Sequence, residues 1–319
     1  MIRAEREIEG RAVVRWGEAA PIPWFGTETV TEAGDALAGL EGRATDLADA
    51  VARVPAGCVC VRAALAAALG DAGGAPGGQG TVKFLPVAGL LPSGRAALEA
   101  VEPRLELGFR VFKWKVGVLP APDEWAMLDD LLGRLPGGAK LRLDANGAWD
   151  RRTAERWLER AAERPVEYVE QPIAHEAGGA EDLLRGLAED YPVKLALDES
   201  INSARDVERW LAADWRGVWV LKPALLGEPD PVLARLAKAG ADVVFGSALE
   251  TAVGARAALR LAFSWAEARG DDAASRRALG FGVWPLFQDA RADAALSGAF
   301  VRREDVERIN PEALWNALS

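Results

Sequence analysis

Residues 140–150, which read KLRLDANGAWD, decide how the rest of the chain is interpreted. A short apolar run alternates into an acid, Asp144, and then an amide, Asn146, before Gly147 breaks the pattern. This order is typical of a buried strand that ends in a polar loop. The stretch therefore predicts that Asp144 lies at the carboxyl end of a strand.

Two further strand-like runs end in acids in the same way. VEYVEQP places Glu170 before a proline, and VKLALDES places Asp198 and Glu199 before a serine. Asp144, Glu170 and Asp198 are separated by 26 and 28 residues, about one strand-plus-helix unit of a βαβ repeat. Parallel strands joined by crossover helices bring their carboxyl ends to one face, so the three carboxylates are expected to converge there.

Three converging carboxylates repel one another unless a cation lies between them, and oxygen ligands favour Mg²⁺ or Mn²⁺ over zinc. A single acid after a βα turn is more often a helix N-cap. Three acids at matching positions favour a metal site over three separate caps.

Strand-like and helix-like segments alternate regularly from residue 81 onward. Eight strand candidates occur, in residues 82–91 and 109–117 and near residues 141, 166, 193, 217, 242 and 279. This repeat favours an α/β fold with a closed parallel barrel over an open doubly wound sheet.

The preceding residues predict a separate, smaller α+β domain. Residues 2–16 suggest a strand, and 29–51 and 56–69 read as Ala/Leu-rich helices. The glycine-rich residues 70–80 have the composition of a linker, so we place the boundary there, with domains at 1–80 and 81–288. Residues 289–319 have no barrel-like repeat and are expected to pack back on the first domain.

Three lysines are expected at the barrel mouth. Lys113 and Lys115 lie two apart in VFKWKVG and so face the same way, with Trp114 turned outward to the helices. Lys222, in VWVLKP, ends the sixth strand across the barrel. A neighbouring cation disfavours the protonated form of a lysine, as a general base requires. The alternative is an internal network of salt bridges with the acids.

Four other residues are candidates for the pocket. Arg142 points inward and would bind a substrate carboxylate or pair with acids inside the barrel. Ser247 and Glu250 in VVFGSALET end the seventh strand, where they would line the pocket or cap a helix. Trp24 lies in GEAAPIPWFGTET, which reads as a mobile lid or as an ordinary connection with a packed aromatic.

Composition limits the partners. The 38 basic and 48 acidic residues give a net charge of −10, which argues against nucleic acid or an anionic membrane surface. We expect a small-molecule carboxylate substrate. The one histidine, His175, excludes a multi-histidine zinc site. Cys58 and Cys60 read as buried helix lining in a reducing compartment, and the absence of a signal-like or membrane-spanning run predicts a cytoplasmic protein. Nothing in the sequence predicts the oligomeric state.

The motifs K-W-K, D-A-N, E-Q-P, D-E-S, L-K-P and G-S-A-L-E-T, in this order and spacing, resemble the enolase superfamily and, within it, the muconate-lactonizing subgroup. The resemblance implies a (β/α)₇β TIM-like barrel with a small α+β capping domain, whose residues 17–29 cover the substrate. It implies roles for the motif residues: Mg²⁺ ligands Asp144, Glu170 and Asp198, support of the metal site by Asn146 and Glu199, and substrate-flanking Lys115 and Lys222, with Lys113 tuning Lys115.

The reaction that the resemblance implies is the syn-dehydration of a succinyl-hydroxycyclohexadiene carboxylate through an enediolate, a step of menaquinone and phylloquinone biosynthesis. Metal and base are both required, because a proton α to a carboxylate is only weakly acidic. Lys115 is expected to act as the base and Lys222 to stay cationic against the other face of the ring.

One alternative reaction stays open, and three other assignments are disfavoured. Racemisation of N-acylamino acids needs the same two lysines. Dipeptide epimerases carry a D-x-D at the eighth strand, where this chain has residues 280–284, GFGVW, and mandelate-racemase types need a late histidine, which is absent. A non-catalytic metal-binding barrel would be expected to lack one of the five central residues, all of which are present.

Overall fold

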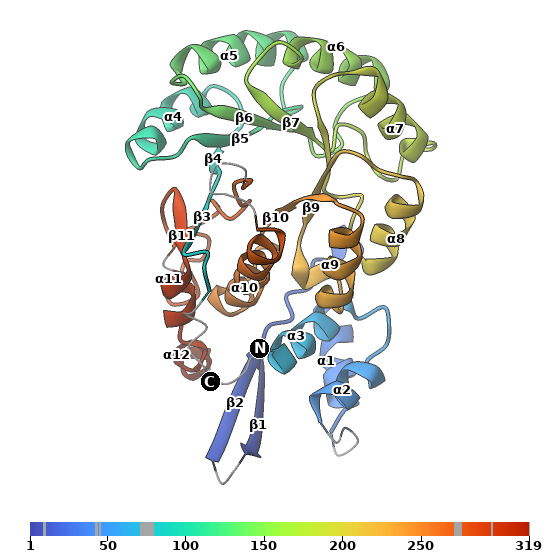
Figure 1. Cartoon of the computed structure of the whole chain (residues 1–319), viewed down its shortest axis with the longest axis vertical. Helices are drawn as coiled ribbons and strands as arrows, with labels where there is room; N and C mark the ends of the chain where they lie inside the picture. Colours follow the sequence, from blue (N-terminus) through green and yellow to red (C-terminus); the bar gives the residue numbers. More distant parts are fainter. Residues whose placement is uncertain are drawn as a thin grey trace.

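The computed structural model describes residues 1–8, 11–41, 44, 46–70, 80–270, 276–294 and 296–318 (Figure 1). The predicted linker falls largely on residues 71–79, which lie outside the described residues. None of the helices formed by the described residues is both long and apolar enough to span a membrane.

A parallel sheet of seven strands forms the centre of the molecule. Its strands follow the order of the chain from one edge to the other, and every neighbouring pair is parallel. The strands are β4 (Gly89–Leu91), β5 (Val111–Lys115), β6 (Lys140–Asp144), β7 (Val166–Glu170), β8 (Leu195–Leu197), β9 (Val218–Leu221) and β10 (Asp242–Phe245).

A helix follows each of these strands, and helices α4 to α8 run along the outside of the curved sheet (Figure 1). The helices are α4 (Ala96–Glu106), α5 (Ala121–Arg134), α6 (Arg151–Ala161), α7 (Ala180–Asp190), α8 (Ala204–Ala212), α9 (Pro229–Lys238) and α10 (Ala252–Arg269). This is the predicted α/β architecture, a TIM-like barrel with a capping domain.

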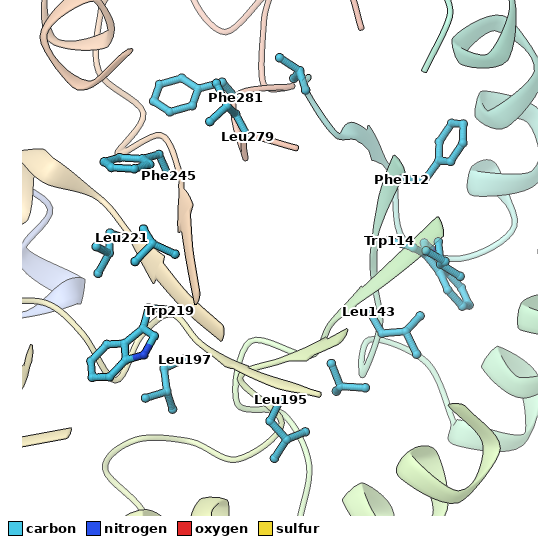
Figure 2. Close-up of a cluster of buried hydrophobic side chains, with 14 of the residues drawn as sticks. Phe112, Trp114, Leu143, Leu195, Leu197, Trp219, Leu221, Phe245, Leu279 and Phe281 are labelled. Atoms are coloured by element: carbon cyan, nitrogen blue, oxygen red, sulfur yellow. The ribbon is translucent and has the colours of Figure 1, made fainter. Parts of the chain in front are cut away.

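Successive side chains along each strand face two different environments, the layer between sheet and helices and the interior of the barrel. Outward-facing side chains such as Trp114, Leu143 and Trp219 are buried between the sheet and the helices (Figure 2). Inward-facing Tyr168 and Val220 belong to a separate cluster inside the barrel. Because successive side chains of a strand point to opposite faces, every second residue is directed to the barrel interior, where the predicted lysines and acids lie.

The predicted eighth strand is reduced to two bridging residues. Leu279 N donates to Pro86 O at 2.7 Å, and Gly280 N donates to Phe245 O at 2.8 Å. Leu279 therefore pairs with Val87 on one side, while Gly280 pairs on the other side with Gly246, just after β10. These bridges join the two edges of the seven-stranded sheet and close the barrel.

The described residues among the first 70 form an antiparallel hairpin, a short 3₁₀ turn and three α-helices. The hairpin and helices lie at one end of the molecule, apart from the curved row of barrel helices (Figure 1). The elements are β1 (Ile2–Ile8), β2 (Arg11–Gly17), a short 3₁₀ turn η1 (Pro23–Phe25), α1 (Val30–Ala38), α2 (Leu47–Arg53) and α3 (Val59–Gly70).

Two local predictions for this region are corrected. The strand expected in residues 2–16 is a hairpin of two strands. The single helix expected over 29–51 is two helices. Thr29 and Glu32 form a capping box that begins α1, α1 ends at Ala38, and the Asp46 side chain caps a new helix.

The last residues contact both the barrel part of the chain and the N-terminal hairpin. Strand β11 (Phe300–Arg302) pairs antiparallel with β3 (Phe84–Pro86), and helices α11 (Arg303–Arg308) and α12 (Pro311–Leu318) follow. The ring of Trp315 lies 5.7 Å, centroid to centroid, from the ring of Trp16 at the end of the hairpin.

Candidate active site

Three carboxylates lie at the carboxyl ends of neighbouring strands. Asp144 ends β6, Glu170 ends β7 and is its register partner, and Asp198 directly follows β8. All three are buried, with 7%, 1% and 4% of their surface exposed. The structure therefore brings together the three acids that the sequence predicted would converge.

Two lysine ammonium groups lie against these carboxylates. Lys113 Nζ is 2.8 Å from Asp144 Oδ2 and 2.7 Å from Glu170 Oε1. Lys222, directly after β9, forms an ion pair with Asp198. Part of the alternative interpretation, a network of salt bridges between the lysines and the acids, is thus present.

The ion pairs do not balance the negative charge. Burial and the neighbouring Asp144 raise the pKa of Glu170 well above its usual range, although Lys113 opposes the shift. Burial opposes the charge of Lys113 as well, but Asp144 and Glu170 outweigh it and raise the pKa of that lysine. Glu170 Oε2 and Glu199 Oε2 are buried without a hydrogen-bond partner. The site therefore has acceptor capacity for another cation.

These residues fit a magnesium ion by their chemistry. The donor set is all oxygen, and buried carboxylate oxygens without partners are the ligands that a hard divalent cation prefers. Among the residues that the structure describes, no three His, Cys, Asp or Glu side chains are already arranged to hold a metal. The lysine ammonium groups are ion-paired with other oxygens of Asp144, Glu170 and Asp198, so the oxygens without partners stay open to a cation.

Tight loops hold the acids in place. Asn146 has a φ of +44° and donates from Nδ2 to Glu199 Oε1 at 2.8 Å, so it links two strand ends. Gly147, with a φ of +73°, passes so close to the next loop that a Cβ would lie 2.8 Å from Ala174 Cα. Asn146 was expected to support the site, and glycine is required beside it because both the φ and the close approach disfavour any side chain.

Gln171 is a supporting residue that the sequence interpretation passed over. It is fully buried with a φ of +37°, and its Oε1 accepts the backbone N–H groups of Asp198 and Ser200 at 3.0 and 3.1 Å. Its Nε2 donates to Ser200 Oγ at 2.8 Å. The signal was the E-Q-P motif, in which a polar residue between a buried acid and a proline holds an uncommon backbone conformation.

Lys115 ends β5 in register with Asp144 and is exposed. None of the side chains that the structure describes forms an ion pair or hydrogen bond with it, in contrast to Lys113 and Lys222. Three strands separate β5 from β9 in the sheet, so Lys115 and Lys222 come from different sides of the barrel. Lys115 therefore stands at the mouth without a partner among the described side chains.

The structure does not bring Arg142 to the mouth. Its side chain is completely buried, its Nε lies 2.6 Å from Glu167 Oε2, and its guanidinium lies 4.8 Å from the centroid of the Tyr168 ring. Of the two interpretations of Arg142, this geometry favours a partner for acids inside the barrel.

Of the other three proposed pocket residues, Ser247 and Trp24 differ in exposure. Ser247 is buried, and its Oγ donates to Glu250 Oε2 at 2.9 Å and accepts from Leu249 N. Trp24 is 75% exposed, whereas the adjacent Phe25 is half-buried with its ring over Lys222. The expected lid thus presents a different aromatic residue to the site.

Comparisons with known proteins agree on one relationship. A family model described as "Enolase C-terminal domain-like" matches residues 95–288. An o-succinylbenzoate synthase from Thermosynechococcus vestitus is 40% identical over 276 residues, which cover 85% of this chain and 80% of that protein. A hydrophobic dipeptide epimerase from Roseobacter litoralis is 33% identical, over 60% of this chain and 59% of its own length.

A solved structure supports the same relationship. The crystal structure of o-succinylbenzoate synthase from Thermosynechococcus elongatus BP-1, complexed with Mg in the active site, superposes with a TM-score of 0.77 and 37% sequence identity. The superposition covers 98% of this chain and 90% of that chain.

Proposed function

The chain belongs to the enolase superfamily, and on this premise we propose that it catalyses the reaction of an o-succinylbenzoate synthase. This reaction is the Mg²⁺-dependent dehydration of 2-succinyl-6-hydroxy-2,4-cyclohexadiene-1-carboxylate to 2-succinylbenzoate. The observation that carries the proposal is the convergence of three buried carboxylates between lysines from two sides of a barrel. The 40% identity to a synthase over most of the chain supports the choice of reaction.

Asp144, Glu170 and Asp198 are the proposed metal ligands, with Asn146 and Glu199 holding the neighbouring loops. Bound Mg²⁺ would supply positive charge to the substrate carboxylate, which stabilises the second negative charge that develops when the α-proton leaves. The unpaired carboxylate oxygens support this assignment, because they leave acceptor capacity that the lysines do not fill.

Lys115 is the proposed base. Its neutral amine removes the proton α to the carboxylate, and the ammonium so formed then donates a proton to the departing hydroxyl on the same face. One C–H bond and one C–O bond break, water leaves, and the ring becomes aromatic. Lys222, from the other side of the barrel, is the proposed cation against the opposite ring face.

Lys113 has a less direct role in this proposal. Its ion pairs with Asp144 and Glu170 keep a positive charge beside the acids, two residues from Lys115 on the same strand. Arg142 is left out of the substrate site because it is buried below the mouth. Ser247 remains a candidate contact through its place after β10, although its hydroxyl is engaged by Glu250.

A cytoplasmic location is part of the same proposal. The two described cysteines, Cys58 and Cys60, are buried and free. Free thiols are typical of reducing compartments.

The experiment is turnover of the cyclohexadiene carboxylate with Mg²⁺, with N-succinylamino acid racemisation measured in parallel. We expect fast dehydration that EDTA abolishes, and a loss of about 10³-fold or more in Lys115→Ala, the size expected for a general base. Lys238→Ala, at the exposed end of α9, is the matched control and should retain activity. Strong racemisation with slow dehydration would instead assign the chain to the racemase reaction.

A further inference from the structure

The loop that follows β2 is anchored at both ends of its tight turn. Ile22 N donates to Thr27 Oγ1 at 2.7 Å, and Phe25 N donates to Ile22 O at 2.8 Å. The Glu28 carboxylate accepts the N–H groups of Cys60 and Val61 in the first turn of α3. Ile22, Thr27 and Glu28 are buried. This part of the loop is therefore fixed to the capping domain.

The anchored turn directs its two aromatic residues differently. Trp24 is 75% exposed. Phe25 is half-buried and packs against a cluster that contains Ile22, Leu225 and Ala248. Leu225 and Ala248 follow the ends of β9 and β10, so Phe25 reaches from the capping domain to the barrel mouth.

The ring of Phe25 covers the Lys222 ammonium. Lys222 Nζ lies 4.8 Å from the ring centroid, within the range of a cation–π contact, and Lys222 is only 9% exposed. The ammonium is thus held between a carboxylate of the barrel, Asp198, and an aromatic face of the capping domain. Such a ring stabilises a cation and also keeps water from it.

From this geometry we infer that Phe25 is a positioning residue, which holds the Lys222 ammonium in the site through its aromatic face. It thereby connects the capping loop to one of the two proposed catalytic lysines. The effect on catalysis rests on the proposed function. The contact itself does not, because it joins two side chains whatever reaction the site performs.

A double-mutant cycle in unfolding tests the contact without any turnover. Unfolding is measured on Phe25→Leu, Lys222→Met and the double variant of the metal-free full chain. Leucine keeps apolar packing against Leu225 and Ala248 but has no aromatic face. We expect the double variant to be more stable than additivity predicts, by about fivefold in the unfolding equilibrium constant.

The matched cycle pairs Lys222→Met with Phe300→Leu, the same change at an exposed phenylalanine that packs on Phe84. This cycle should be additive, because distant sites without shared partners do not couple. Additivity in the Phe25 cycle, or equal coupling in both cycles, would overturn the inference.

Turnover then tests the positioning role. Phe25→Leu should lower kcat about tenfold with a smaller change in KM, whereas Phe25→Tyr, which keeps the ring face, should stay within about threefold of the wild type. Equal losses in both variants would contradict a role for the aromatic face. If the wild-type chain does not dehydrate the substrate, the proposed function fails, while the unfolding cycle still decides whether the contact exists.

Discussion

The two ends of the barrel interior hold similar charged residues, but the acids are fully paired with basic groups at only one of them. At the mouth, Lys113 and Lys222 face Asp144, Glu170 and Asp198. At the opposite end, which we call the floor, two arginines and a lysine face two acids: Arg142, Lys194, Arg277, Glu167 and Asp242.

At the floor, both carboxylates are paired with basic side chains. Glu167 accepts one nitrogen of Arg142 and one of Arg277, and Asp242 accepts two nitrogens of Arg277 and the ammonium of Lys194. Burial would raise the pKa of Glu167, but Arg142 outweighs it and the pKa is lowered. The pKa of Asp242 is likewise lowered to about 2, because its hydrogen bonds to Arg277 and Lys194 outweigh burial.

At the mouth, the negative charge of the carboxylates is not fully balanced by the lysines. Glu170 is more deeply buried than Glu167, and its pKa is raised, because burial and Asp144 outweigh the lysine. The atoms left without partners are acceptors at the mouth, Glu170 Oε2 and Glu199 Oε2, and donors at the floor, Arg142 Nη1 and Nη2. A network whose carboxylates are all paired stabilises the barrel, whereas a network that lacks positive charge can take up a metal ion.

The largest expected effect is at the mouth. Glu170→Gln removes a proposed metal ligand, so we expect kcat/KM to fall by about 10³-fold or more. The stabilisation of the wild-type chain by Mg²⁺, about 2.7 kcal/mol at 100 times the Kd, should disappear. Thermal unfolding with and without Mg²⁺ measures it. The comparison would fail if the variant were stabilised by Mg²⁺ as the wild type is.

At the floor, Arg277→Met should act on stability instead. It leaves Glu167 and Asp242 short of a partner, and breaking such a buried network costs about 3 kcal/mol or more. Urea unfolding measures the loss. Activity per folded molecule and the Mg²⁺-dependent stabilisation should both be retained, and a selective loss of either would mean that the floor is not purely structural.

Glu250 is a further buried acid, between the mouth and the capping domain. Burial and the nearby Glu18 raise its pKa from 4.5 to about 7. The folded state therefore binds more protons than the unfolded state in this interval, and stability falls as pH rises from about 4.5 to about 7, by at most about 3 kcal/mol. Comparing urea unfolding of the wild type and Glu250→Gln across this range isolates the contribution. A slope that the variant leaves unchanged would assign it to other groups.

The smallest effect is expected at Trp24. Because its ring is 75% exposed, Trp24→Ala should change stability by no more than about 0.5 kcal/mol. It should change kcat/KM by less than about threefold, well below the effect of Phe25→Leu. Steady-state kinetics on the two variants measures the difference. A larger loss in Trp24→Ala would return Trp24 to the substrate site, as first expected from the sequence.

The sequence by itself determined the barrel and the positions of the three acids. Strand periodicity is a local property that can be read from the sequence. An acid at the end of a buried strand in a βα repeat must lie at the face where the carboxyl ends of the strands meet. Lys113, Lys115 and Lys222 followed from the same reasoning. The supporting role of Asn146 and Glu199 came from the family resemblance, and the structure adds the hydrogen bond that links their side chains.

Only the tertiary structure decided which charges pair and which aromatic residue reaches the site. Inward direction alone does not distinguish Arg142 from Asp144, because depth within the barrel depends on how the strands are staggered against each other. Trp24 and Phe25 are neighbours with similar local signals, and the turn fixed by Thr27 and Glu28 sets which ring faces Lys222. The extent of the eighth strand was also decided only by the structure, in which, among the residues it describes, Leu279 and Gly280 alone bridge residues 86–88 and the end of β10.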